Sequence, residues 1–380
     1  MSKVDTSLIL FADRFVPPAM MVEQAKAYEA SGVVDYMELS DQLVNFIPPE
    51  LWTPQNSPLA KVMPDLDSAA DAFVMAAYCV AAAPKLKLTL ATDSIRHGPA
   101  EMVQTMLTFA NLTNGNALFQ IGGGEVKQAK PYGWKRAEGI GRFEDLCKAF
   151  HGFLDTNGPI DMAGRYTKFH KAYLGSAKQH RPQLWALGGG PKLIDLATSY
   201  CDGLSVAVPS VWWAPQQAKK EIERIRADVR AKGRDPDKFR FGMWCPVMLH
   251  ESAEVIKREL NNPLIRWMSA VFGRITPEDW RAVGITPPLP DGWTYYQHLL
   301  PYDTSPEFVA EVLSKTGPEL SAKGMLAGTP KQVADMMGPY IDAGISMVLP
   351  IDYLSLVMPP EEGAATMARS IELCAHLKAK

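Results

Sequence analysis

Short apolar runs alternate with amphipathic helical patterns along almost the whole chain, and this alternation restricts the fold more than any other feature. Strand-like runs, most of them followed by a helical pattern, occupy residues 7–12, 34–41, 86–92, 117–122, 183–188, 203–208, 239–249 and 345–352. Strands that alternate with helices in this way form parallel sheets with right-handed crossovers. Eight such units predict the α/β class and a (β/α)8 TIM barrel, in preference to an open, doubly wound sheet.

Two segments interrupt the alternation. Residues 156–181 form a polar stretch with several glycines, and residues 251–325 contain proline-rich and aromatic sequence without a strand-helix rhythm. Because barrel enzymes carry substrate-binding segments on loops at the carboxyl ends of the strands, we expect the second insertion to pack over the barrel mouth. The chain of 380 residues is therefore predicted to be one barrel domain, residues 1–380, with two insertions.

Charge and apolar content exclude several functional classes. The 39 lysines and arginines are balanced by 42 acidic residues, and no basic stripe is present that could neutralise the phosphates of a nucleic acid. No apolar run reaches the length of a membrane span. Five widely spaced cysteines without a CxxC pair, and seven histidines without a zinc-binding spacing, indicate buried thiols and no metal site. We expect a cytoplasmic protein that acts on a small molecule.

The carboxyl ends of the predicted strands indicate where chemistry could occur, because these ends form the active-site rim of a TIM barrel. The polar and glycine residues at these ends are Asp41, Gln42, Thr92, Gly122, Gly123, Gly124, Glu125, Gly189 and Gly190. Glycine lets the backbone approach a ligand closely, and residues 188–190 open onto a helix start that could hold a phosphate. The alternative interpretation of both glycine triplets, residues 122–124 and 188–190, is that they form tight turns and bind no ligand.

Asp41 and Glu125 are acidic residues of this rim. A carboxyl group beside a bound ring can act as a general acid or base when burial raises its pKa. A solvated charge is the alternative for either residue. His97, which follows the third strand, is a further candidate proton donor, and a half-buried histidine without a chemical role is the alternative there.

Four motifs in this arrangement resemble the luciferase-like flavin and deazaflavin oxidoreductases, and in particular the branch that uses coenzyme F420, an 8-hydroxy-5-deazaflavin hydride carrier. The motifs are "ELSDQ" at the second strand end, "IGGGE" after the fourth strand, "LGGGPKLIDLATSYCDG" after the fifth and "AGTPKQVADMMGPYIDAGISMVL" near the C-terminus. Within that branch the chain is most similar to phthiodiolone ketoreductase-type members. The resemblance extends over nearly the whole chain and implies a TIM barrel that forms a homodimer.

The resemblance also implies roles for individual residues. Glu125 is implied to be the acid or base that serves the deazaflavin ring, with Asp41 and Gln42 as the other catalytic residues. A non-prolyl cis peptide is implied in a bulge of the third strand, near Thr89 and Leu90 and behind the cofactor ring. Cofactor contacts are implied for Asp41, Leu90, Thr92, Gly122, Gly123, Gly124, Gln128, Gly189, Gly190, Lys192 and Leu193.

One departure from the branch bears on the reaction. Relatives that oxidise an alcohol carry a histidine after the strand-end aspartate, where this chain has Gln42, and an amide cannot act as a base. Phe46 stands where sugar-phosphate-oxidising relatives have tryptophan, and the lysines that bind their phosphate have no convincing counterpart. The predicted reaction is hydride transfer between the deazaflavin C5 and a ketone or alcohol, or an activated double bond, of a bulky apolar substrate.

Aromatic residues after the sixth and seventh strands suit such a substrate, and ordinary packing is the alternative. They are Trp212, Trp213, Trp244, Trp267, Trp293, Tyr295 and Tyr296. Three other functions are considered. The first is a luciferase-like monooxygenase that uses flavin mononucleotide (FMN), and the second is a non-catalytic flavin-binding or deazaflavin-binding protein. The third, a barrel lyase or aldolase, would need a strand-end lysine or a metal cluster, and the predicted strand ends provide neither.

Overall fold

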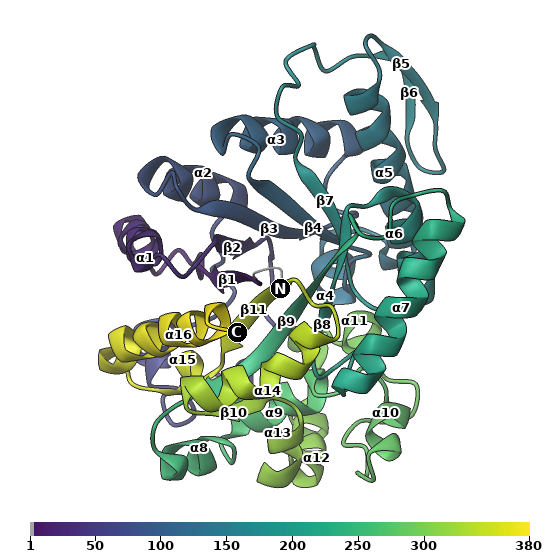
Figure 1. The fold of residues 1–380 in the computed structure, drawn as a ribbon. Helices are drawn as coiled ribbons and strands as arrows, with labels where there is room; N and C mark the ends of the chain where they lie inside the picture. The colour runs from purple at the N-terminus through teal and green to yellow at the C-terminus, as the bar shows by residue number, and fades with distance from the viewer. Residues whose placement is uncertain (1–3) are drawn as a thin grey trace.

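The computed structural model describes residues 4–380, and within them eight parallel strands close into a barrel (Figure 1). The barrel strands are β1 (Asp5–Ile9), β2 (Tyr36–Ser40), β3 (Lys87–Asp93), β4 (Ala117–Gly122), β7 (Gln183–Leu187), β8 (Gly203–Ala207), β9 (Arg240–Leu249) and β11 (Met347–Asp352). The barrel closes at β1, which pairs in parallel with β2 on one edge and with β11 on the other. The predicted TIM barrel is confirmed.

Helices cover the outside of the barrel, and local sequence explains where they begin and end. The outer helices are α1 (Pro18–Ser31), α2 (Ala72–Ala82), α3 (Pro99–Leu112), α5 (Gly139–Asp155), α6 (Pro191–Tyr200), α7 (Pro215–Ala231), α14 (Pro330–Asp342) and α16 (Gly363–Lys378). Several of them begin at a proline, because the first helical N–H has no partner to lose. Helix α14 begins at a capping box formed by Thr329 and Gln332. Helix α1 ends at Gly32, whose φ of 65° suits a residue without a side chain.

Strand β9 is longer than its neighbours and carries an additional strand that the sequence analysis did not predict. Residues 240–244 of β9 pair with β8, and residues 247–249 pair with the short strand β10 (Leu326–Gly328). The other edge of β9 pairs with β11 from Gly242 to Val247. Strand β10 therefore continues the sheet beyond the end of β8, where the second insertion returns to the barrel.

The two insertions form compact additions of different kinds. The first contains an antiparallel hairpin of β5 (Ile160–Ala163) and β6 (Lys168–Ala172). The second contains the helices α8 (Ala253–Glu259), α9 (Pro263–Phe272), α10 (Pro277–Ala282), α11 (Tyr295–His298), α12 (Pro306–Lys315) and α13 (Pro318–Lys323). Helix α9 packs on the loop after β2, where the indole of Trp267 donates a hydrogen bond of 2.9 Å to the carbonyl of Phe46. The second insertion and the loop after β2 contribute to a second apolar core at the barrel mouth, apart from the core between strands and outer helices, against which the first insertion packs.

The inside of the barrel changes from apolar to polar along its axis. At the amino ends of the strands, Tyr36, Leu118, Trp185 and Met347 pack together. Glu38 lies one layer further along, opposite Thr89 of β3. Both Glu38 oxygens are buried without a well-oriented hydrogen-bond partner among the described residues, and burial raises the pKa of this carboxyl well above its usual range. Burial inside the barrel therefore favours the protonated, uncharged form of this acid.

The peptide bonds of β3 correct one expectation. Within residues 4–380 the single cis peptide bond is the one between Val208 and Pro209. The expectation of a non-prolyl cis bond near Thr89 and Leu90 is therefore wrong. Strand β3 keeps a continuous parallel register with β2 and with β4 through both residues. The strand consequently has no bulge at this point that could hold such a bond.

All five cysteines are buried and unpaired, as expected. Over residues 4–380, no group of three or more histidine, cysteine, aspartate or glutamate side chains is placed to hold a metal ion. Among the helices of the described chain, none has both the length and the apolar content that a membrane crossing requires.

Candidate active site

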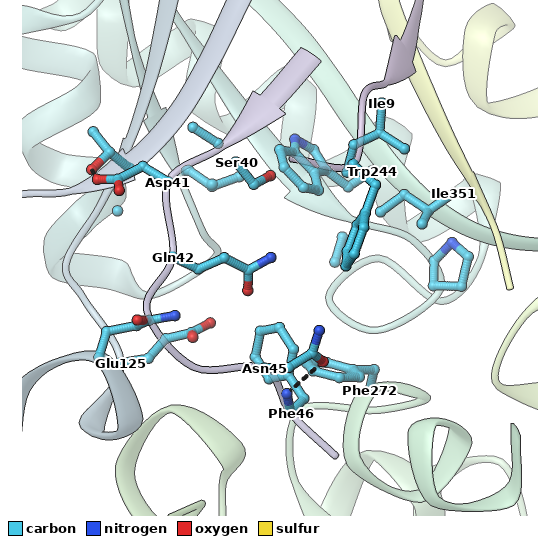
Figure 2. Close-up of a pocket in the computed structure, with 18 of the residues that line it drawn as sticks. Ile9, Ser40, Asp41, Gln42, Asn45, Phe46, Glu125, Trp244, Phe272 and Ile351 are labelled. Carbon is cyan, nitrogen blue, oxygen red and sulfur yellow. Dashed lines mark hydrogen bonds between the residues drawn. The ribbon is translucent and has the colours of Figure 1, made fainter. Parts of the chain in front are cut away.

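A cavity of about 2370 Å³ lies at the carboxyl ends of the barrel strands (Figure 2). Its strand-borne wall includes Ser40, Ala91 and Trp244, and the second insertion contributes Phe272 and Tyr295. The residues predicted for the site that line this cavity are Asp41, Gln42, Thr92, Gly122, Gly123, Gly124, Glu125, Gln128, Gly189, Gly190, Lys192 and Leu193. These predicted residues come from four different segments of the sequence and meet in one cavity, at the end of the barrel where the strand pattern placed them.

Asp41 follows β2 and is held by a network of polar side chains. Its Oδ2 accepts hydrogen bonds of 2.7 Å from the Thr92 hydroxyl and 2.8 Å from Arg96, and lies 2.8 Å from Nε2 of His97. Arg96 also donates to Asp93 over 2.6 Å, so one guanidinium joins two strand-end carboxylates. Burial raises the pKa of Asp41, but the hydrogen bond with His97 and the charge of Arg96 outweigh burial and bring it below its usual value. Asp41 is therefore an ionised anchor with few acceptor sites left for a ligand.

Glu125 follows the glycines of β4, and its partner is a buried lysine. Lys127 on α4 (Val126–Ala129) places Nζ 3.2 Å from Glu125 Oε2, and it also donates to the carbonyl of Val44. The same ammonium lies 3.7 Å from the ring centroid of Phe46. Burial lowers the pKa of Lys127, and the Glu125 carboxylate partly offsets this effect. The lysine thus fixes one oxygen of Glu125, while about a quarter of the Glu125 side chain stays accessible (26%).

Gln42 extends into the middle of the cavity in Figure 2, between Asp41 and Asn45. The loop that carries it is held by Gln128, whose Oε1 accepts a 2.7 Å hydrogen bond from the Leu43 N–H. The Gln128 amide also donates to the carbonyl of Val44 over 3.0 Å. Gln128 therefore supports the loop of Gln42, and its implied contact with a cofactor stays a prediction.

The glycines of the two triplets differ in how closely other atoms pack against them. A Cβ on Gly123 would lie 2.9 Å from Ile140 Cδ1, and a Cβ on Gly189 would lie 2.3 Å from Val211 Cγ1, so both positions need glycine for packing. A Cβ on Gly190 would meet nothing within 4 Å. Gly190 directly precedes Pro191 at the start of α6, where the first backbone N–H groups point out of the helix. The second triplet thus offers an open approach to a helix N-terminus.

An aromatic wall faces these polar groups across the cavity. The rings of Phe46 and Phe272 meet edge to face at 4.6 Å, and Phe272 meets Tyr295 at 4.7 Å. Trp244 of β9 donates a 2.7 Å hydrogen bond from its indole to Gln120 inside the barrel. Of the seven aromatic residues expected near a substrate, Trp244, Tyr295 and Tyr296 line the cavity.

Two of the candidates lie outside the cavity lining. Leu90 is fully buried in the core between the sheet and the outer helices, because side chains alternate along β3 and its neighbour Ala91 faces the cavity. His97 is engaged with Asp41, and its ring meets Phe73 edge to face. His97 therefore contacts the site through Asp41 and does not itself line the cavity.

Three charged residues of the site were missed in the sequence. Arg96 directly precedes His97 and Lys127 directly precedes Gln128, two residues that were recognised, and each makes contacts that only the folded chain brings together. Arg136, in the 3-10 turn Arg136–Glu138, lines the cavity, and within residues 4–380 its buried Nε has no hydrogen-bond partner. The signal that could have identified these three residues in the sequence was their proximity to a strand-end motif.

Asp352 ends β11, lines the same cavity and is expected to make stability depend on pH. Burial raises its pKa from 3.8 to about 7, despite hydrogen bonds from the N–H groups of Leu354 and Leu249. Between those two values the folded carboxyl stays protonated while the unfolded one ionises, so its contribution to stability falls as pH rises. The full loss, reached above pH 7, is roughly 4 kcal/mol at about 1.4 kcal/mol per pH unit.

Asp352→Asn imitates the protonated acid and keeps an oxygen acceptor for both N–H groups. Urea unfolding should show the variant gaining stability relative to the parent protein between about pH 5 and about pH 8. A difference between the two proteins that stays constant over this range would contradict the assignment.

Comparison with known proteins gives consistent results. Residues 16–347 match a family model described as luciferase-like monooxygenase. A phthiodiolone/phenolphthiodiolone dimycocerosates ketoreductase from Mycobacterium kansasii is 25% identical over 352 residues, which cover 91% of this chain and 94% of that protein.

Solved structures of low sequence identity share the fold over the whole chain. An F420-dependent secondary alcohol dehydrogenase in complex with an F420-acetone adduct aligns with a TM-score of 0.70 and 18% identity, covering 99% of each chain. A coenzyme F420-dependent tetrahydromethanopterin reductase from Methanopyrus kandleri aligns with a TM-score of 0.67 and 14% identity, covering 99% of this chain and 100% of that one.

Proposed function

The chain belongs to the luciferase-like monooxygenase family, and on this basis we propose that it is a coenzyme F420-dependent oxidoreductase. It would transfer a hydride between the deazaflavin C5 and a ketone or alcohol, or an activated double bond, of a bulky apolar substrate. The observation that carries the proposal is that Glu125 and Gln42 line the same cavity as the glycine-rich ends of β4 and β7. The ketoreductase and F420-dependent dehydrogenase among the similar proteins support the same reaction type.

The residues around the cavity suit an anionic, ring-bearing cofactor. The unobstructed backbone at Gly190 and the N-terminus of α6 would receive a phosphate, with Lys192 beside them. Arg136, whose buried Nε has no partner within residues 4–380, would supply a further donor to an anionic group. The aromatic wall of Phe46, Phe272 and Tyr295 would leave the remaining space apolar. When bound, the deazaflavin supplies or accepts the hydride at C5.

The substrate would be bound and polarised by the loop after β2. The amide of Gln42 would donate a hydrogen bond to a carbonyl oxygen, but it cannot take up a proton. Glu125 would hold or deliver the proton, in a position fixed by Lys127 at 3.2 Å. The ionised Asp41 and its partner Arg96 would keep the end of β2 and the end of β3 in place during the reaction. The aromatic wall would exclude water from the reacting atoms.

Spectroscopic titration tests the cofactor, because binding changes the absorption of a deazaflavin or a flavin. We expect saturable binding of F420 and weak or absent binding of FMN. The F420 complex should then be oxidised or reduced by a member of a panel of apolar ketones, secondary alcohols and enones. Tight FMN binding with oxygen uptake in the presence of reduced FMN would instead favour a monooxygenase, the activity that the family description names. Cofactor binding without any turnover would favour a non-catalytic carrier.

A homodimer is part of the same proposal. Val74 and Tyr78 on α2 and Leu112 on α3 are large, exposed apolar side chains, and these two helices pack side by side. A second copy of the chain would cover them. Sedimentation analysis of the purified protein gives the subunit number directly.

A further inference from the structure

Lys127 is a fully buried lysine that lies directly behind Glu125. Its side chain is 1% exposed and is among the largest fully buried side chains of residues 4–380. It belongs to α4, all four residues of which are buried, and it does not line the active-site cavity, whereas Glu125 does. Taking an ammonium group out of water is costly, and lysine is rarely buried unless it is paired. The role of this lysine is therefore to be found in its partners.

Three acceptors surround Nζ of Lys127, and they match the three N–H bonds of an ammonium group. They are Glu125 Oε2 at 3.2 Å, the carbonyl oxygen of Val44 at 2.5 Å and the face of the Phe46 ring, whose centroid lies 3.7 Å away. The carbonyl and the ring belong to the loop after β2, which also carries Gln42. The protonated lysine is thus fully satisfied, and of its three partners only Glu125 can take up a proton.

Glu125 connects the buried lysine with the cavity. Its side chain is 26% exposed and lines the cavity, on the same side as Gln42 in Figure 2. Within residues 4–380, the contact with Lys127 is the single ion pair that Glu125 forms. Because a carbonyl oxygen and an aromatic ring do not take up a proton near neutral pH, a proton that leaves Lys127 passes to Glu125. The pair therefore forms a path from a buried nitrogen to the reacting centre.

Burial and the carboxylate act in opposite directions on the protonation of Lys127. Burial, the larger effect, lowers the pKa of the ammonium group, and Glu125 raises it through its charge and its contact. Arg96, the partner of Asp41, lowers this pKa further, and Asp67 raises it. The lysine consequently releases its proton more readily than a lysine in water does. An acid and a base in such close contact titrate as a pair.

The elements packed against α4 provide no competing carboxyl group. They are η3 (Lys130–Tyr132) and α11 (Tyr295–His298). The titratable and charged groups on or directly beside them are Lys130, Tyr132, Arg136, Tyr295, Tyr296 and His298. Burial raises the pKa of Tyr132 and of Tyr295, so both phenols keep their protons at neutral pH. Glu125 is therefore the proton acceptor that this part of the fold offers to Lys127.

We propose that Lys127 stores the proton that Glu125 delivers to the oxygen of a ketone substrate, so that the pair holds one proton at neutral pH. The proposal rests on the proposed function and adds the source of its proton. When the carbonyl carbon accepts a hydride from reduced F420, an N–H bond of Lys127 breaks and an O–H bond forms on Glu125. That proton then passes to the ketone oxygen, which becomes a hydroxyl group.

The same scheme accounts for the return of the proton. Delivery leaves the pair as an amine and a carboxylate, which together lack one proton. Because Lys127 is sealed from water and Glu125 is not, the proton returns from solvent through Glu125. Lys127 is a positioning residue in this scheme, since it acts on the substrate only through Glu125.

Nuclear magnetic resonance of the full-length protein with isotope-labelled lysine tests the shared proton without cofactor or turnover. Loss of a signal in Lys127→Gln identifies the buried lysine. We expect this signal to titrate at lower pH than those of surface lysines. Glu125→Gln should move its titration to still lower pH, because burial then acts without the carboxylate. The matched control is Lys315, which pairs with Glu311 on the surface of α12 at 2.6 Å and should titrate unchanged in Glu125→Gln.

Single-turnover reduction of a ketone by reduced F420 tests delivery of the proton. The rate of the parent protein should stay level through neutral pH and fall in alkaline solution, where the buried ammonium group loses its proton. In Lys127→Gln the rate should fall about tenfold per pH unit above about pH 5, where an ordinary glutamate is ionised. Lys127→Arg keeps a positive charge but holds its proton, so it should not restore the parent profile. Lys315→Met should retain that profile.

The outcomes separate this proposal from the proposed function. A parent-like pH profile in Lys127→Gln, or one restored by Lys127→Arg, would show that the lysine only holds the loop and would overturn the proposal while ketones are still reduced. A buried lysine signal that Glu125→Gln does not move would also overturn it, and this result needs no folded Lys127 variant. Coupled titration in a protein that reduces no ketone would instead overturn the proposed function and keep the shared proton.

Discussion

Replacing Glu125 by glutamine is expected to lower the rate of hydride transfer about 10²–10⁴-fold, the usual contribution of a positioned acid or base. Glutamine has nearly the same shape and can still accept a hydrogen bond from Lys127, which lies 3.2 Å from Oε2 in the parent protein. It cannot take up or release a proton at neutral pH. The rate should be measured in single turnovers by stopped-flow absorption of the cofactor, so that binding and chemistry are separated.

Two control measurements show whether Glu125→Gln affects the chemical step specifically. Cofactor affinity from spectroscopic titration should change much less than the rate, because in the proposed site the glycine ends and α6, which line the cavity, would provide the binding contacts. Glu254→Gln, on the exposed first turn of α8, removes a carboxylate far from the cavity lining and should have no effect. An unchanged single-turnover rate in Glu125→Gln would remove this residue from the mechanism.

Replacing Arg96 by methionine should destabilise the protein by about 3–5 kcal/mol, the usual loss when one partner of a buried ion pair is removed. The Arg96 side chain is only 4% exposed, and it bonds to the carboxylates of Asp41 and Asp93 at 2.8 and 2.6 Å. Without the guanidinium, two largely buried carboxylates at neighbouring strand ends would lose their shared cation, and Asp41 would keep only Thr92 and His97 as side-chain partners. The free energy of unfolding from urea titration gives the change directly.

Matched variants distinguish a buried network from an ordinary ion pair. Arg142→Met breaks the pair with Glu138 on the helix surface, where the arginine is 30% exposed, and should cost less than about 1 kcal/mol. Asp41→Asn combined with Arg96→Met should recover part of the loss, because one uncompensated carboxylate is removed. Equal losses from Arg96→Met and Arg142→Met would show that burial does not strengthen the Arg96 network.

The architecture was predictable because its signals are local and repeated. Apolar runs recur with each unit, prolines start several of the outer helices, and a capping box at Thr329 starts α14; each of these signals acts within a few residues. The extra strand β10 has three residues and exists through its pairing with the end of β9, a contact between segments about 80 residues apart in the chain. No local pattern of three residues can predict such a pairing. The continuous register of β3 similarly depends on both neighbouring strands.

The site was predictable in its location and less so in its contacts. The rule that barrel chemistry lies at the strand ends selected Asp41, Gln42 and Glu125 before their geometry was known, and all three line the cavity. The same reasoning did not show that Asp41 is mostly occupied by Thr92, Arg96 and His97. Leu90 was selected from the resemblance, but the alternation of side chains along β3 turns it towards the core.

The sequence by itself determined the repeated βα order, the closure into eight units and the set of strand ends that carry polar or glycine residues, since all of these depend on short-range patterns. Only the tertiary structure decided which charges meet. Lys127 becomes the partner of Glu125 because the loop after β2 covers it, and Met20 of α1 and Met367 of α16 line one cavity because the barrel closes between β1 and β11. Burial and distance, which set pKa values and the strength of ion pairs, arise when segments distant in sequence pack together.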